Sequence, residues 1–313
     1  MVGDDTLYSA IILTRIAHVC TIGMKKSTSA TRILRNRIVL IFDFDGTLGP
    51  STTETFFDAH DLDHKTFYDE VNRRQEEDDW QYALAKAELL REWSHRDGSP
   101  ITQENMQQMG REYPLFGGAD TLVERLRRHA AEKDKEVELE FVLLTAGFGV
   151  IPNATVIAEQ FDRVYAGELI FDDEGKVKGA KRIITHVDKV HYIKQLQEGL
   201  DLDRPSDLEN TYLDHDSDND YVPMSQVVYV GDGASDMSAF QVVESGGGIA
   251  IAIDPDGGGV HDWEGYQHMS PERRVHNVAQ ADYSDDAELY RSLVLAIDRN
   301  IAEIQLLRLG EGE

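Results

Sequence analysis

The sequence predicts an α/β protein with a doubly wound parallel sheet. Short apolar strands alternate along the chain with segments of helical periodicity, and this order is typical of parallel sheets that helices cover on both faces. The chain has 313 residues, of which 41% are hydrophobic, so it can bury a sizeable core. Domains average about 150 residues, so this length favours two domains.

The charge balance argues against nucleic acid as a partner. Asp and Glu number 58 against 31 Lys and Arg, which gives a net charge of −27. Binding to nucleic acid or to an anionic membrane needs a basic face, and no stretch approaches the roughly 20 apolar residues of a membrane helix. The single cysteine, Cys20, rules out an internal disulfide and favours a reducing cytoplasm.

Residues 1–37 are predicted to lie outside the fold, as an extension that is disordered in solution. The apolar run 11–24 is broken by Arg15, and the acidic pair Asp4–Asp5 precedes it where a secretory signal carries positive charge. We interpret 1–23 as a disordered tail or as the result of an upstream start-site choice, with a signal peptide as the remaining alternative.

The first strand is predicted at 38–42, where five apolar residues run directly into Asp43 and Asp45. Aspartate is a poor strand residue and is costly to bury without a partner. In doubly wound sheets, however, ligands bind at the carboxyl ends of the strands. We therefore interpret the two aspartates as residues of a site at that edge.

A long helical segment follows at about 52–112. It is rich in Glu, Gln, Arg and Ala, its apolar residues recur at helical spacing, and it lacks strand-like alternation. Residues 114–118 contain proline and two glycines and end this segment. An amphipathic helix is predicted next, at 119–131.

The remaining elements continue the alternation of strands and helices. The second buried strand ends in a polar turn at Thr145, and the third runs into a Gly-Asp-Gly turn. In chain order we expect a strand at 140–145, a helix at 154–160, a hairpin formed by 168–171 and 176–178, a helix at 188–198, an acidic loop at 201–220, strands at 227–230 and 249–253, and a helix at 285–309.

Four aspartates are predicted to gather at the carboxyl edge of this sheet: Asp43, Asp45, Asp232 and Asp236. Four carboxylates held close together repel one another, and a hard divalent cation such as Mg²⁺ relieves this repulsion. The glycines beside them allow the backbone to approach an anion closely and to point its N–H groups at it. These features together suit phosphoryl transfer.

At this point the sequence resembles the haloacid dehalogenase superfamily, and within it the phosphoserine-phosphatase-like branch. The resemblance covers about 38–300 and rests on four motifs in order. These are Asp-x-Asp-Gly-Thr at 43–47, Thr145 at a strand end, a lysine motif at 184–189, and Gly-Asp-Gly-x-x-Asp at 231–236.

The resemblance implies catalytic roles for two neighbouring carboxylates. Asp43 is expected to attack phosphorus and form an aspartyl-phosphate, while Asp45 protonates the leaving oxygen and later activates water. An aspartate at position 45 favours phosphate esters, because family members that dehalogenate do not carry one there. Thr145, Ala146 and Lys189 are expected to contact the phosphoryl group of the substrate. Thr145 and Lys189 are also expected to be catalytic, Thr145 by donating to a phosphoryl oxygen and Lys189 by neutralising Asp43 and the transferred group.

The resemblance also implies a Mg²⁺ site and a domain layout. Asp43, Asp45 through its backbone carbonyl, Asp232 and Asp236 are the expected ligands, with Asp236 either ligating or orienting from just outside. A helical cap domain at 49–115 is expected to be inserted into an α/β core that comprises 38–48 and 116–313. The expected fold is thus a Rossmann-like core with an inserted cap.

We therefore expect a cytoplasmic, Mg²⁺-dependent phosphatase that acts on a small phosphorylated metabolite. A phosphotransferase or mutase with the same aspartyl-phosphate is one alternative, and a catalytically silent protein that binds a phosphometabolite is another. Lys181 and Lys194 compete with Lys189 for the lysine role. The acidic run 214–220 does not predict a calcium loop, because Asn219 and Ser225 stand where Gly and Glu are needed.

Overall fold

The computed structural model describes residues 36–203, 221–254 and 275–310. Its centre is a seven-stranded sheet with the order β4-β3-β2-β1-β5-β6-β7. All neighbouring strands are parallel except β3 and β4, which form an antiparallel hairpin at one edge. The doubly wound α/β prediction is thereby confirmed. The strands are β1 (Arg37–Phe42), β2 (Glu138–Phe148), β3 (Arg163–Phe171), β4 (Val177–Arg182), β5 (Val227–Gly231), β6 (Ile249–Asp254) and β7 (Asn277–Gln280).

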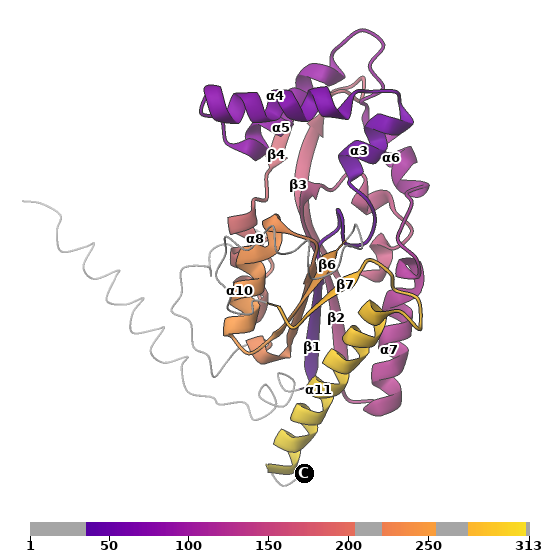
Figure 1. Ribbon diagram of the computed structural model, residues 1–313, viewed down its shortest axis with the longest axis vertical. Coiled ribbons are helices and arrows are strands. Elements are labelled where there is room, and N and C mark those ends of the chain that lie inside the picture. The colour runs from indigo at the N-terminus through magenta and orange to yellow at the C-terminus, as the bar shows by residue number, and fades with distance from the viewer. Residues whose placement is uncertain (1–35, 204–220, 255–274, 311–313) are drawn as a thin grey trace, which may run out of the picture.

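Helices cover both faces of the sheet (Figure 1). On one face, α7 (Leu122–Lys133) packs against β2, and α11 (Glu288–Gly310) packs against β7 and α7. On the other face, α8 (His186–Gln197) contacts β2, and α10 (Met237–Ser245) contacts β5 and β6. A sheet covered in this way needs strands that are apolar on both sides, as the run at 38–42 is.

The central strand β1 supplies side chains to two separate hydrophobic cores. Ile38, Leu40 and Phe42 point toward the face that α7 and α11 cover, whereas Val39 and Ile41 join the core beneath α8 and α10. All five side chains are at most 1% exposed. This alternation follows from the two-residue repeat of a strand, and it fixes the direction in which β1 delivers Asp43.

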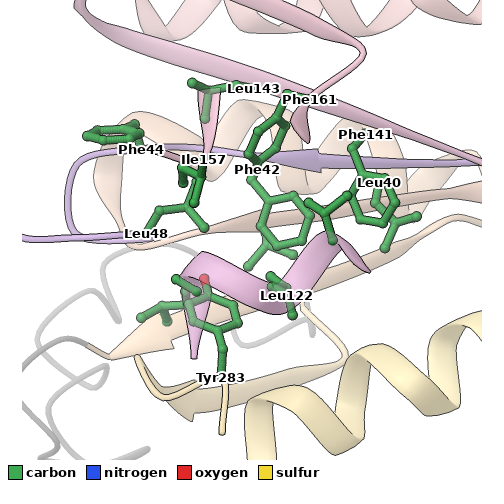
Figure 2. Close-up of a cluster of buried hydrophobic side chains, with 14 of the residues drawn as sticks. Leu40, Phe42, Phe44, Leu48, Leu122, Phe141, Leu143, Ile157, Phe161 and Tyr283 are labelled. Carbon is green, nitrogen blue, oxygen red and sulfur yellow. The ribbon is translucent and has the colours of Figure 1, made fainter. Parts of the chain in front are cut away.

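Aromatic residues fill the first of these cores just below the end of β1 (Figure 2). The ring of Phe42 lies 6.4 Å from that of Phe141 and 6.1 Å from that of Phe161, measured between centroids. Tyr283 closes the cluster, and its buried Oη donates a hydrogen bond to the carbonyl of Thr47 at 2.8 Å. The loop after β1 is thus supported from below by a packed apolar layer.

Five α-helices lie between β1 and β2 in the chain; the last, α7, covers the sheet, and the first four sit beyond the carboxyl ends of the strands (Figure 1). We call these four the inserted helices. The side chains of Ser51, Asp63 and Thr102 accept hydrogen bonds from backbone N–H groups in the first turns of three of them. They are α3 (Thr52–Ala59), α4 (His64–Glu77), α5 (Tyr82–Ser94) and α6 (Gln103–Arg111).

The β3–β4 hairpin reaches up to the inserted helices. The hydroxyl of Ser94 accepts a hydrogen bond from Val177 N at 2.9 Å and donates one to Ile101 O at 2.6 Å. The backbone N–H of Gln103 donates to Gly175 O at 2.8 Å. The hairpin predicted around 172–175 is confirmed, and it joins α5 and α6 to the sheet.

One prediction about local structure is wrong, and one strand was missed. The helix expected at 154–160 is replaced by two short 3-10 turns, Pro152–Ala154 and Ala158–Gln160, because Thr155 between them takes an extended backbone conformation. Strand β7 was not predicted at all. Predictions for 1–23 and for most of 201–220 fall on residues outside the described ranges. Within those ranges, no helix has the length and apolar composition that crossing a membrane requires.

Candidate active site

The carboxyl ends of β1 and β5 bring the two aspartate motifs together. Asp43 follows β1, and its backbone N–H donates to Val230 O in the neighbouring strand at 2.9 Å. Asp232 follows β5 directly. Asp43, Asp232 and Asp236 each offer a carboxylate oxygen, and these oxygens all lie within 4.8 Å of one another. Three of the four predicted carboxylates are therefore gathered in the structure, and the side chain of Asp45 lies outside this group.

A glycine makes this close approach possible. Gly46 has a φ of +71°, which L side chains rarely adopt, and a Cβ atom at this position would lie 2.0 Å from Asp232 Oδ2. Its N–H donates to Gly49 O at 2.8 Å and closes a tight turn. The loop after β1 therefore packs directly against the second motif.

Lys189 lies between the carboxylates. It is fully buried, and its Nζ is 3.0 Å from Asp43 Oδ2 and 2.6 Å from Asp236 Oδ1. Helix α8 is positioned by a capping box in which Thr185 and Asp188 exchange hydrogen bonds with each other's backbone N–H groups. This cap starts the helix one turn before Lys189 and turns that residue toward the sheet.

The two competing lysines lie elsewhere. Lys181 is exposed on β4 and forms a salt bridge with Glu168 at 2.7 Å. Lys194 is exposed on α8, although it is only five residues beyond Lys189. Of the three candidates, Lys189 is the one that the fold brings to Asp43.

Asp236 is held by hydrogen bonds on both of its oxygens. Oδ1 accepts from Lys189 Nζ at 2.6 Å and from the phenol of Tyr229 at 2.5 Å. Oδ2 accepts from the backbone N–H groups of Asp232 at 3.2 Å and Gly233 at 3.4 Å. A carboxylate with this many donors is best suited to orienting its neighbours, which is one of the two roles expected for it.

The crowding of buried carboxylates shifts the pKa values of the site. Burial, followed by the charges of Asp236, Asp232 and Asp45, raises the pKa of Asp43 to about 8, although Lys189 opposes this shift. Burial and Asp236 similarly raise the pKa of Asp232 to about 7. Burial alone would lower the pKa of Lys189, but Asp236 and Asp43 raise it above its ordinary value, so Lys189 stays charged.

The donor set fits a magnesium ion. Asp43 Oδ1 is buried and has no hydrogen-bond partner within the described residues, which is costly unless another group satisfies it. Asp232 is partly buried beside it, and both groups offer hard oxygen ligands of the kind that Mg²⁺ prefers. Asp43 and Asp232 are therefore the side chains placed to hold the ion.

Asp45 has a different environment from Asp43. Its carboxylate accepts hydrogen bonds from Thr52 at the start of α3, at 2.7 Å from the backbone N–H and 3.3 Å from Oγ1. It lies outside the group of three metal-competent carboxylates and lines the cavity described below. Its side chain is thus free of the ion site and available for proton transfer.

Thr145 lies near the end of β2, where the pairing with β3 becomes irregular between Leu144 and Phe148. Its hydroxyl accepts a hydrogen bond from Gly147 N at 3.0 Å. Ala146, between them, is exposed. This irregular stretch turns both Thr145 and Ala146 toward the same cavity.

A cavity of about 740 Å³ covers these residues. Its floor comes from the sheet edge and the start of α8, and its other wall comes from the inserted helices α4 and α5. A volume of this size suits a small organic ligand. The lining residues include Asp43, Asp45, Thr145, Ala146, Asp188 and Asp232 on one side, and Tyr68, Gln75, Gln81, Tyr82 and Lys86 on the other.

Three residues of this site were not predicted from the sequence. Thr52 fixes Asp45, Tyr229 fixes Asp236, and Lys86 lines the cavity. Tyr229 interrupts an otherwise aliphatic strand, and this polar interruption two residues before the Gly-Asp-Gly turn is a signal that could have identified it. Thr52 and Lys86 carry no comparable signal.

Comparison with known proteins identifies the fold. No protein-family model and no curated protein matches the chain. A solved structure titled as a phospho-aspartyl intermediate analogue of phosphoserine phosphatase is 16% identical, and the match covers 82% of this chain and 98% of that one with a TM-score of 0.50. This likeness shows a shared fold.

Two other solved structures match over large parts of the chain. Phosphoserine phosphatase in its apo form is 18% identical over 69% of this chain and 86% of its own, with a TM-score of 0.45. A probable phosphoserine phosphatase from Vibrio cholerae is 15% identical over 84% of this chain and 65% of its own, with a TM-score of 0.49.

Proposed function

We propose that this chain, which has the fold of phosphoserine phosphatase, is a phosphatase of the haloacid dehalogenase superfamily that acts on a small phosphate monoester. The observation that carries the proposal is the buried contact of Lys189 with Asp43 beneath a cavity that Asp45 also lines. One carboxylate is thereby paired with the ammonium group of Lys189, whereas the carboxylate two residues away is held by hydrogen bonds from Thr52. The cytoplasm remains the predicted location.

Asp43 is the proposed nucleophile. One of its oxygens attacks the phosphorus atom, the ester oxygen departs, and an aspartyl-phosphate forms. Lys189 stabilises the negative charge that develops on the transferred group, and it lowers the pKa of Asp43 against the larger effect of burial, which favours the ionised carboxylate. The hydroxyl of Thr145 can turn from its intramolecular contact to donate to a phosphoryl oxygen.

Asp45 is the proposed acid and base. It gives a proton to the leaving alkoxide in the first step and takes one from water in the second, when water attacks the aspartyl-phosphate. The two hydrogen bonds from Thr52 hold the carboxylate at the cavity wall. Because it is apart from the proposed ion site, its proton exchange is not suppressed by a bound cation.

Asp43 and Asp232 would hold Mg²⁺, together with the backbone carbonyl of Asp45. The ion, when bound, supplies positive charge that neutralises the phosphoryl oxygens. Asp236 acts on this site by orienting Asp232 and Lys189 through its hydrogen bonds. This gives Asp236 a positioning role, in place of direct ligation.

The proposal is tested by following phosphate release from p-nitrophenyl phosphate with Mg²⁺. We expect Asp43→Asn to lower kcat by several orders of magnitude, because the amide keeps the shape but cannot attack. Asp173→Asn, at an exposed position of the hairpin turn, is the matched control and should behave as the wild type. Near-normal turnover by Asp43→Asn would refute the mechanism, and no turnover by the wild type on any phosphate ester would refute the proposed function.

A further inference from the structure

One positive charge stands on the wall of the cavity opposite the catalytic residues. Lys86 of α5 is half-buried, and its Nζ lies 5.6 Å from the ring centroid of Tyr68 on α4. Among the described residues that line the cavity, Lys86 is the only lysine or arginine. In a protein with a net charge of −27, a single cation at the wall of the cavity suggests a role in binding a ligand.

The charge of Lys86 is not used to hold the inserted helices together. The arginines of α4 and α5 all form salt bridges, Arg73 and Arg74 with Glu70 and Arg91 with Glu88, and Arg74 also joins α4 to α5 through Glu92. Lys86 forms no salt bridge with any described carboxylate. Burial alone would lower its pKa, but Tyr68, Asp45 and Tyr82 raise it above its ordinary value, so the ammonium is kept.

The surroundings of Lys86 contain hydrogen-bonding groups without negative charge. Tyr68, Gln75, Gln81 and Tyr82 line this wall, and no described Asp or Glu of α4 or α5 lines it. The acidic residues of the cavity all come from the core side, where the phosphoryl group and cation are expected. The far wall therefore favours an anion and offers no carboxylate to an ammonium group.

From this juxtaposition we infer that Lys86 determines substrate specificity by binding a second acidic group, a carboxylate or a second phosphate, on the organic part of the substrate. The inference rests on the proposed function and deepens it. The preferred substrates are phosphate monoesters that carry another anionic group and lack an ammonium group near it. Apolar side chains between the two walls, including Phe148, Ile183 and Val187, contact the carbon skeleton.

The test uses alkyl phosphates of equal length that end in a methyl group, a carboxylate, a phosphate or an ammonium group. With the wild type and Mg²⁺, kcat/KM should be higher for the two acidic substrates than for the methyl one, and lowest for the ammonium one. In Lys86→Gln the ratio of acidic to methyl substrate should fall about tenfold or more, as expected for losing a hydrogen bond to a charged group. The change should appear mainly in KM.

Two further variants make the result decisive. Lys86→Arg keeps the charge and should keep much of the preference, which separates charge from a loss of packing. Lys65→Gln removes an exposed lysine of α4 and should leave the ratio unchanged, which controls for the net charge of the inserted helices. Preference for one acidic end group over the other identifies which anion the site binds.

The inference fails if the wild type shows no preference for an acidic end group, or if Lys86→Gln slows all four substrates equally. It also fails if the ammonium substrate is preferred, because Asp45 or Asp188 would then dominate recognition. Each of these outcomes includes measurable turnover, so the proposed function stands. Loss of the proposed function is a separate result, in which the wild type releases phosphate from none of the esters.

Discussion

The sharpest prediction concerns the replacement of Lys189 by methionine. Lys189 is completely buried, and its Nζ contacts Asp43 at 3.0 Å and Asp236 at 2.6 Å. Methionine keeps most of the side-chain volume, so packing changes little and the variant isolates the loss of charge. Two buried carboxylates then have no cation beside them in the metal-free protein.

Removing one partner of a buried ion pair typically costs about 3–5 kcal/mol. The remaining donors to Asp236 soften this loss, because the phenol of Tyr229 and two backbone N–H groups still bind it. Within the described part of the chain, the side chain of Asp43 keeps no such donor, and its pKa, already raised to about 8 by burial, rises further without Lys189. We therefore expect a loss of about 3 kcal/mol in the free energy of unfolding.

The loss should depend on pH in a defined direction. A carboxyl group with a raised pKa in the folded state destabilises the fold as pH rises above its unfolded value, because its charged form is disfavoured by folding. Because wild-type Asp43 ionises in the folded state at about pH 8 and the variant's Asp43 only at higher pH, the difference between Lys189→Met and the wild type should be larger at about pH 9 than at about pH 7. Urea unfolding at both pH values measures it, without added metal.

Activity provides the second readout for the same variant. Removal of a preorganised charge at the reacting phosphoryl group typically lowers kcat about 10²- to 10³-fold. Lys194→Met and Lys181→Met, at exposed positions, should stay within about tenfold of the wild type. A Lys189→Met variant with near-normal activity would show that the lysine at Asp43 has no catalytic role, and an inactive Lys194→Met variant would show that exposure does not separate the two lysines; either result would refute the reasoning.

Two further predictions concern the ion and the loop that approaches it. The pKa values of Asp43 and Asp232 are raised to about 8 and about 7, so the metal-free fold loses stability as the pH rises. Mg²⁺ should therefore raise Tm more at about pH 8 than at about pH 5. An equal rise in Tm at both pH values would contradict this prediction. Gly46→Ala should abolish the rise in Tm that Mg²⁺ produces, because the new Cβ would lie 2.0 Å from Asp232 Oδ2. It should also lower the free energy of unfolding by about 1–2 kcal/mol. Gly98→Ala is the control, because Gly98 has a similar φ of +69° but a Cβ there would have no atom within 4 Å. This variant should lose a similar free energy of unfolding through its backbone conformation, and Mg²⁺ should still raise its Tm.

The strands that carry the site could be predicted because each combines a buried apolar run with an abrupt polar end. Residues 38–42, 140–145 and 227–230 have this pattern, and the structure places β1, β2 and β5 there. Strand β7 lacks it, since Asn277 and Gln280 are polar and it lies at the sheet edge. Its place is fixed by pairing with β6, which no local pattern reveals.

The residues that approach the site from distant segments could not be predicted. Lys86 and Asp45 are 41 positions apart (86 − 45), and they share a cavity only because α5 packs on α4 and on the β3–β4 hairpin. Thr52 looks like an ordinary residue of the first helical turn until its contact with Asp45 is seen. Helix phase, in contrast, is local, and for this reason Lys189 could be chosen over Lys194 from the sequence.

The hairpin that joins β3 and β4 determines how a ligand can reach the cavity. Val177 is hydrogen bonded to Ser94, and Gly175 to Gln103. These bonds attach the inserted helices to the β3–β4 extension of the sheet. A rigid-body movement of all four inserted helices away from the core would break these hydrogen bonds. Tyr82 and Val187, 40% and 61% exposed, both border the cavity, so we expect a ligand to enter beside these two side chains.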